Sequence, residues 1–183
     1  MSSAEESGFR LVDVHHVADT SFLKIELLEM VSPTGRTMER TVVRHPGAVA
    51  VVAIDGSDVV LIRQYRAAVD RPVLEIPAGK LDVPGEDLEQ AARRELEEEV
   101  GLQAQSVRLL TTFWTTPGFS DERMWVYLAT GLKAVGSRPH GAEEEVAEVV
   151  RVGVADIPAM LAADVFEDAK TIIGLAAMVA ERT

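Results

Sequence analysis

Short hydrophobic stretches separated by turn residues run along most of the chain. Many are rich in valine and isoleucine, and several alternate hydrophobic with polar positions, so they predict β-strands. The predicted strands cover residues 11–15, 22–30, 37–43, 48–54, 59–65, 73–76, 107–115, 124–129 and 148–152. Ser32-Pro-Thr-Gly35 and Asp55-Gly56 lie between such strands and are typical of hairpin turns.

Two segments near the C-terminus, residues 155–164 and 167–181, have helical periodicity instead. Many strands, one central helix and two closing helices predict an α+β fold, in which a mixed sheet lies between helices. Residues 1–8 are expected to form a flexible tail. Residues 9–183 are expected to form a single domain, because no stretch within them has the composition of a linker.

The central helix is predicted where a loop rich in proline and glycine runs into a segment with helical periodicity. Asp87 and Glu89 place negative charge in its first turn, which a helix N-terminus favours, and Gly101 suits a left-handed C-cap. At about 100° per residue, one face of this helix forms an apolar stripe. The stripe consists of Leu88, Ala91, Ala92 and Leu96.

Two carboxylates interrupt this stripe. Glu95 and Glu99 fall inside it, one turn apart, and Glu98 lies beside it. Burying carboxylates without a partner is costly, so something must neutralise them. Clustered carboxylate oxygens suit a hard cation such as Mg²⁺ or Mn²⁺, and this pattern therefore predicts a metal site.

A simpler interpretation is a solvated, charge-rich helix. Arg93 can pair with Glu97, and Arg94 with Glu98, because residues four apart are neighbours on a helix. This interpretation accounts for the exposed charges of the helix but leaves the two carboxylates of the apolar stripe unexplained.

The composition narrows the class of protein. The 183 residues carry 30 acidic and 18 basic side chains, a net charge of −12, which argues against binding to nucleic acid or to an anionic membrane. The absence of cysteine excludes disulfides and thiolate chemistry. The first residues lack the pattern of a signal peptide, and no apolar run has membrane-spanning length, so a cytoplasmic protein is expected.

Residues in and before the central helix resemble the Nudix box, G-x5-E-x7-R-E-U-x-E-E-x-G-U. The matching residues are Gly79, Glu86, Arg94, Glu95, Leu96, Glu98, Glu99, Gly101 and Leu102. The one departure is that six residues instead of five separate Gly79 from Glu86. The extra residue, Val83 or a neighbour, falls in a loop, where added length is tolerated.

The resemblance implies an α/β/α sandwich and metal-assisted hydrolysis of a diphosphate. It implies that Mg²⁺, with Mn²⁺ as the alternative, is bound by Glu95, Glu98, Glu99 and the carbonyl of Ala78. It also implies that Arg94 orients the glutamates, which its i,i+4 spacing to Glu98 allows.

Further segments are similar to the ADP-ribose pyrophosphatase subfamily. They are Glu75-Ile-Pro-Ala-Gly79, the loop from Thr116 to Glu122 with its Pro117, and the β-rich residues 9–45 that precede the core at 46–183. The similarity implies hydrolysis of ADP-ribose to AMP and ribose 5-phosphate. It also implies a homodimer that shares its N-terminal strands.

The same similarity implies that Arg66, Glu75 and Arg44 bind substrate, with Arg44 near the adenine end. Arg66 also fits a surface arginine at a strand end, and Glu75 fits a structural salt bridge. Glu145, with Glu144 as the next candidate, is the implied general base. Both belong to an acidic stretch that also fits a merely solvated loop.

Two other functions remain open. One is hydrolysis of another nucleoside diphosphate derivative, such as a sugar nucleotide or a dinucleoside polyphosphate. The other is a sensor that binds ADP-ribose without cleaving it, although such modules usually have damaged box carboxylates and a DNA-binding domain.

Overall fold

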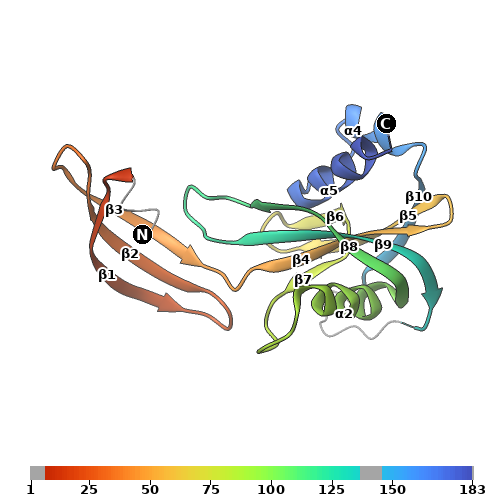
Figure 1. Cartoon of the computed structure of the whole chain (residues 1–183), viewed down its shortest axis with the longest axis horizontal. Helices are drawn as coiled ribbons and strands as arrows, with labels where there is room; N and C mark the ends of the chain where they lie inside the picture. The colour runs from red at the N-terminus through yellow and green to blue at the C-terminus, as the bar shows by residue number, and fades with distance from the viewer. Residues whose placement is uncertain (1–6, 137–145, 183) are drawn as a thin grey trace. The chain divides into compact units, whose positions relative to one another are not determined.

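The computed structural model describes residues 7–136 and 146–182, and the chain forms two compact units (Figure 1). One unit comprises the chain up to Gly47 together with Trp114–Arg123, and the other comprises Ala48–Phe113 and the chain from Met124 onward. Most of the expected tail and the two candidate bases Glu144 and Glu145 lie outside the described residues. Among the helices of the described residues, none has the length and apolar character needed to cross a membrane.

The first unit is built on a three-stranded antiparallel sheet in the order β1-β2-β3. Its strands are β1 (Arg10–Asp19), β2 (Lys24–Val31) and β3 (Thr37–Arg44). The predicted turn at Ser32–Gly35 joins β2 to β3, and Gly35 has the positive φ of 79° that this turn requires. The segment Trp114–Arg123 attaches to β3, because the Val43 amide donates to the Phe119 carbonyl at 2.8 Å.

The second unit contains a mixed sheet of seven strands. They are β4 (Ala48–Asp55), β5 (Asp58–Arg66), β6 (Arg71–Glu75), β7 (Ala78–Lys80), β8 (Leu102–Trp114), β9 (Arg123–Ala134) and β10 (Glu148–Gly153). The main path is β10-β5-β4-β9-β8, with β6 paired to β5 and β7 paired to β4. The sheet is mixed because β4 runs parallel to β9 and antiparallel to β5.

Helices cover both faces of this sheet (Figure 1). Helix α2 (Leu88–Val100) packs on one face, and α4 (Ile157–Ala162) and α5 (Ala169–Ala180) pack on the other. Strand β4 is buried on both faces, so its sequence is a continuous hydrophobic run. The α+β architecture with a mixed sheet between helices is therefore confirmed.

Several elements differ from the boundaries that the sequence predicts, and β1 and β9 are both longer than expected. Strand β8 begins at Leu102, directly after the C-cap of α2, although glutamines dilute the hydrophobic pattern there. Strand β7 forms in a segment predicted to be loop, because it pairs with β4 from Ala48↔Lys80 to Ala50↔Ala78. Helix α4 is shorter than residues 155–164.

Candidate functional site

Helix α2 is fixed at both ends by local contacts. The Asp87 side chain accepts a hydrogen bond from the amide of Glu89 at 2.9 Å, and Gly101 adopts the left-handed C-cap with φ 66°. Gly101 is the C-cap that the sequence predicted, whereas Asp87, predicted in the first turn, is the N-cap residue directly before it. The buried face then includes the predicted alanines and Leu96, and with them the carboxylate of Glu95.

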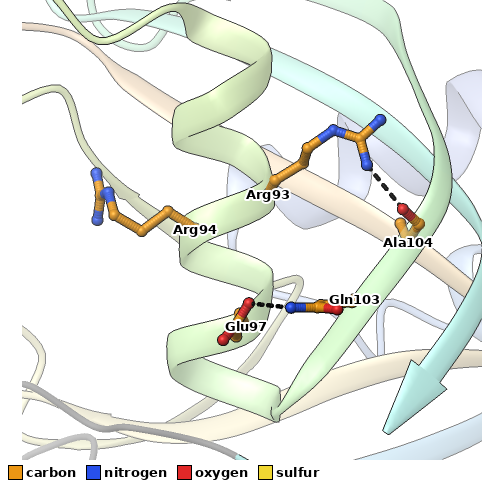
Figure 2. Close-up of a pocket in the computed structure, with 5 residues that line it drawn as sticks. All are labelled: Arg93, Arg94, Glu97, Gln103 and Ala104. Carbon is orange, nitrogen blue, oxygen red and sulfur yellow. Dashed lines mark hydrogen bonds between the residues drawn. The ribbon is translucent and has the colours of Figure 1, made fainter. Parts of the chain in front are cut away.

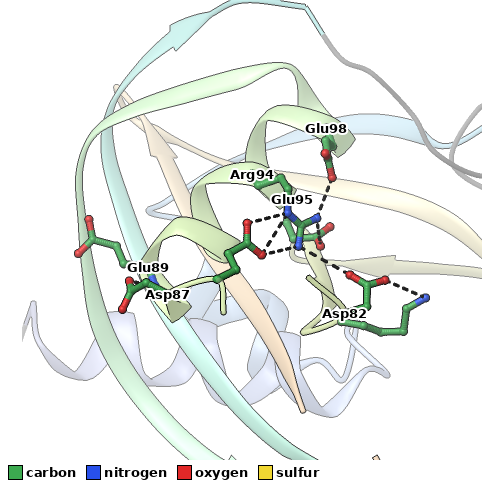
Figure 3. A network of polar contacts seen from close by, with 8 residues as sticks. Asp82, Asp87, Glu89, Arg94, Glu95 and Glu98 are labelled. Atoms are coloured by element: carbon green, nitrogen blue, oxygen red, sulfur yellow. Dashed lines mark hydrogen bonds and ion pairs between the residues drawn. The ribbon is translucent and has the colours of Figure 1, made fainter. Parts of the chain in front are cut away.

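The charge network around Arg94 holds these carboxylates together (Figure 3). Its guanidinium donates to Glu95 at 2.7 Å, to Glu98 at 2.9 Å and to Glu86 at 3.0 Å. Burial raises the pKa of Glu95 to about 6, and the charge of Arg94 counteracts this. A solvated helix does not account for a carboxylate that is 9% exposed on the core-facing side, so this geometry favours a functional site.

Arg93 and Arg94 point to opposite sides of α2 (Figure 2). Arg94 pairs with Glu98 as predicted, but the predicted pairing of Arg93 with Glu97 is wrong. Arg93 pairs with Glu89 at 2.8 Å and donates to the Ala104 carbonyl at 2.7 Å. Glu89 and Glu97 each lie four residues from Arg93, so the sequence alone does not choose between them. The hydrogen bond from Arg93 to the Ala104 carbonyl of β8 accompanies the pair with Glu89.

A small pocket of about 270 Å³ lies beside these contacts, between α2 and the start of β8. Gln103 donates to Glu97 across it at 2.8 Å. Arg93 donates to Ala104 at its edge, and Arg94 is held by the carboxylates outside it, so we do not assign the reaction to this pocket.

Glu99 connects α2 to the loop before the helix. Its side chain accepts a hydrogen bond from the amide of Ala78 at 2.8 Å. The preceding carbonyl, that of Pro77, accepts from the Val51 amide of β4 at 2.8 Å. The loop that carries the Ala78 carbonyl is therefore fixed against both the helix and the sheet.

The oxygen donors of this region are of the type that suits a hard cation. The carboxylates of Glu95, Glu98 and Glu99 share one helix, and the backbone of Ala78 touches Glu99. Arg94 now supplies the positive charge to two of the carboxylates. Over residues 7–136 and 146–182, no three acidic or histidine side chains form a ready-made metal cluster.

Arg66 and Glu75 form a bidentate ion pair. The Nε and Nη2 atoms of Arg66 donate to the two carboxylate oxygens of Glu75, each at 2.7 Å. The hydrogen bond to Glu75 is the main cause that raises the pKa of Arg66, burial opposes it, and the charge of Glu99 adds to it. The charge of Glu99 on α2 therefore acts on Arg66.

The third member of this cluster is Lys170, which the sequence did not predict. Its ammonium pairs with Glu75 and, at 3.0 Å, with Asp168, which caps α5. A positive charge in the first turn of a helix is unfavourable because of the helix dipole. The position of Lys170 at the start of a predicted helix could therefore have indicated that a carboxylate lies beside it.

Arg44 belongs to the first compact unit. It pairs with Glu26 at 2.8 Å and with Asp121 at 3.1 Å. Beside it is a pocket of about 410 Å³, partly apolar, whose lining includes Met38, Arg40 and Phe119. The similarity to the ADP-ribose pyrophosphatase subfamily implies that Arg44 lies near the adenine end.

The predicted bases Glu144 and Glu145 lie outside the described residues. The described chain continues into β10 at Glu148, which pairs with Arg63 of β5. Arg66 ends the same strand β5.

Comparison with known proteins identifies the family of this domain. The NUDIX domain model matches residues 44–173 of the chain. An ADP-ribose pyrophosphatase from Bacillus subtilis (strain 168) is 40% identical over 150 residues, which are 81% of this chain and 80% of that protein. A methanol dehydrogenase activator from Bacillus methanolicus is 36% identical over 154 residues, 84% of this chain and 83% of that protein.

A crystal structure of an ADP compounds hydrolase has the same fold, with a TM-score of 0.81, 26% sequence identity and coverage of 94% of this chain and 93% of that chain. The resemblance of the central helix to the Nudix box is thereby confirmed at the level of the whole domain. The chain belongs to the NUDIX domain family.

Proposed function

We propose that this protein hydrolyses the diphosphate of ADP-ribose, using a divalent cation, to give AMP and ribose 5-phosphate. The observation that carries the proposal is the buried carboxylate of Glu95, which shares α2 with Glu98 and Glu99. The similarity to an ADP-ribose pyrophosphatase and to an ADP compounds hydrolase supports the choice of substrate.

Glu95, Glu98 and Glu99, with the carbonyl of Ala78, are the residues that would hold Mg²⁺ or Mn²⁺. A bound divalent cation neutralises phosphate charge and lowers the pKa of a water ligand. Arg94 orients Glu95 and Glu98, since it already donates to both, and the Ala78 amide orients Glu99. Its positive charge also limits their mutual repulsion when no cation is present.

Phosphoryl transfer depends mainly on positioning and charge neutralisation, and Arg66 is suited to both. The pair with Glu75 uses its Nε and Nη2 atoms. The remaining nitrogen, Nη1, donates to no residue in the part of the chain that the structure describes and is available to a phosphate oxygen. Glu75 acts by holding Arg66, and this is how we propose that both residues contribute to substrate binding.

Arg44 and the pocket beside it in the first unit are proposed to bind the adenine end. Arginine stacks on planar rings and tolerates partial burial, which suits this role. Residues 9–45 are further proposed to form a homodimer interface. Strand β1 supports this, because Leu11, Val12, Val14 and Val17 are all exposed on it.

Glu145, with Glu144 as the alternative, is proposed as the general base that takes the proton from the attacking water. Box carboxylates that hold a cation are less available for this step. In the sequence these glutamates come shortly before β10, the neighbour of β5.

The experiment that tests the function is a substrate panel. The purified protein is incubated with Mg²⁺ and ADP-ribose, a sugar nucleotide or a dinucleoside polyphosphate, and products are identified by mass spectrometry. We expect AMP and ribose 5-phosphate and the highest kcat/KM with ADP-ribose. Faster cleavage of another member selects the alternative hydrolase, and tight binding of ADP-ribose without cleavage selects the sensor.

A further inference from the structure

We propose that Lys170 is a positioning residue for the diphosphate reaction, which acts through Glu75 to hold Arg66 toward the substrate. This inference rests on the proposed function and extends it to a residue of α5. Lys170 lies 95 positions from Glu75 in the sequence and is outside the Nudix box.

The geometry places one carboxylate between two cations. Glu75 is 1% exposed, and Lys170 is 9% exposed. Arg66 occupies both oxygens of the carboxylate, and the ammonium of Lys170 donates to one of them, Oε2. Both cations therefore fix the position of this one carboxylate, and Asp168 balances part of the charge of Lys170.

Lys170 also restricts where this carboxylate can sit. Its ammonium is itself held by Asp168 at 3.0 Å, and Asp168 accepts from the Thr171 amide at 2.9 Å. The hydroxyl of Thr171 in turn accepts from the Ile76 amide at 2.9 Å. The last residue of β6 and the residue that follows it are therefore both tied to the first turn of α5.

The same short segment continues to the carboxylates of α2. Ile76 is followed by Pro77, which is bonded to β4, and by Ala78, whose amide donates to Glu99. A displacement of Glu75 would consequently reach both Arg66 and the loop that carries the Ala78 carbonyl.

A purely structural role for Lys170 is the competing explanation. Removing one partner of a buried ion pair leaves the other charge uncompensated and lowers stability, so a loss of stability alone would fit either role. The first turn of α5 is also an unfavourable place for a cation. If Lys170 were only a structural anchor, its substitution would lower the melting temperature, but its effect on KM would not depend on Arg66.

The test compares Lys170→Met and Lys170→Arg in the full chain with ADP-ribose and Mg²⁺. We expect Lys170→Met to raise KM about tenfold with kcat changed less than about threefold, because it removes binding shared by ground state and transition state. Lys170→Arg should restore most of the affinity. Lys170→Gln keeps a hydrogen-bond donor without the charge and replaces Lys170→Met if the latter does not fold.

The matched control is Arg108→Met. Arg108 forms an exposed ion pair with Glu181, the C-cap of the same helix α5, and its loss should leave KM unchanged. The decisive comparison is the double variant Lys170→Met with Arg66→Met, in which the Lys170 substitution should add less than about twofold to KM. Effects on KM that multiply in the double variant would overturn the proposal, and so would a Lys170→Met protein with wild-type KM.

A readout without catalysis separates this inference from the proposed function. The Nε–H resonance of Arg66, assigned with Arg66→Met, should be protected from solvent exchange in the wild type and in Lys170→Arg, and should exchange faster in Lys170→Met. If this proton exchanges with solvent at the same rate in Lys170→Met as in the wild type, the inference is overturned, whatever the substrate is. A wild type that does not cleave ADP-ribose overturns the proposed function and leaves this measurement valid.

Discussion

The backbone of Gly79 lies directly against the carboxyl group of Glu95. A Cβ atom at position 79 would meet the Glu95 carboxyl carbon at 2.0 Å and both its oxygens at 2.1 Å. The requirement for glycine is therefore one of space, since the φ angle of Gly79 is not positive. Gly79 and Glu95, both residues of the Nudix box, therefore pack directly against each other.

We expect Gly79→Ala to displace Glu95. Overpacking of this kind costs about 1–3 kcal/mol in unfolding free energy. A displacement of about 1 Å at a catalytic group can lower kcat/KM on the order of 100-fold. Gly56→Ala is the control, because Gly56 has φ +63° and a Cβ added there would have no neighbour within 4 Å. It should lose stability through backbone strain and keep full activity, and equal activity in both variants would contradict the packing argument.

Glu98→Gln and Glu99→Gln should remove most activity with the fold intact. Each removes one oxygen ligand of a divalent cation, which is expected to lower kcat by about 10²–10⁴. The wild type should be inactive in excess EDTA and recover with added Mg²⁺ or Mn²⁺. Glu97→Gln is the control, because Glu97 bonds to Gln103 on the other side of the helix. Normal turnover in either of the first two variants would contradict the assignment of the metal ligands.

Glu75→Gln should destabilise the protein at neutral pH. Burial raises the pKa of Glu75, but Arg66 and Lys170 outweigh this effect and lower it below the ordinary value of 4.5. Because the folded pKa is lowered, the stabilisation is complete above pH 4.5 and disappears as the pH falls through the folded pKa. Removing one partner of a buried pair costs about 3–5 kcal/mol in unfolding free energy.

The measurement is denaturant unfolding of wild type and Glu75→Gln between pH 3 and pH 8. The difference between the two proteins should be largest near neutral pH and shrink below about pH 4.5. Glu181→Gln removes an exposed carboxylate with a lowered pKa and should have a much smaller effect. A difference that is independent of pH would show that Glu75 does not act through its charge.

Glu145→Gln should lower kcat by about 10²–10⁴, the usual contribution of a positioned acid or base, with little change in KM. Glu143→Gln should be nearly silent and serves as the control in the same acidic stretch. If Glu144→Gln is the damaging substitution, the base lies one residue earlier. If all three variants are fully active, no loop glutamate acts as the base.

A homodimer that depends on residues 10–45 is expected in solution. The exposed hydrophobic side chains of β1 would otherwise remain in contact with water. Deletion of residues 1–45 should give a poorly soluble or inactive core, whereas deletion of residues 1–8 should leave the dimer intact. Sedimentation of the full chain as a monomer at micromolar concentration would contradict this prediction.

Local signals predicted the parts of the fold that depend on neighbours in the sequence. The caps of α2 at Asp87 and Gly101 and the burial of Glu95 all follow from spacing along one helix. Strand β7 and the pairing of Lys170 with Glu75 depend instead on segments that meet only in the folded chain. For the same reason the sequence did not predict that Trp114–Arg123 joins the N-terminal strands.

The loop between Gly79 and Glu86 is one residue longer than the family pattern, yet Glu86 still bonds Arg94 at 3.0 Å. The added length is taken up in a turn where the Glu86 amide donates to the Val83 carbonyl at 3.2 Å and Gly85 has φ 78°. A search for this family with a fixed spacing would therefore reject functional chains. The turn at Val83–Pro84 is accordingly a natural insertion point for a reporter peptide or an affinity tag, since it is exposed and the Glu86–Arg94 bond withstands a change in loop length.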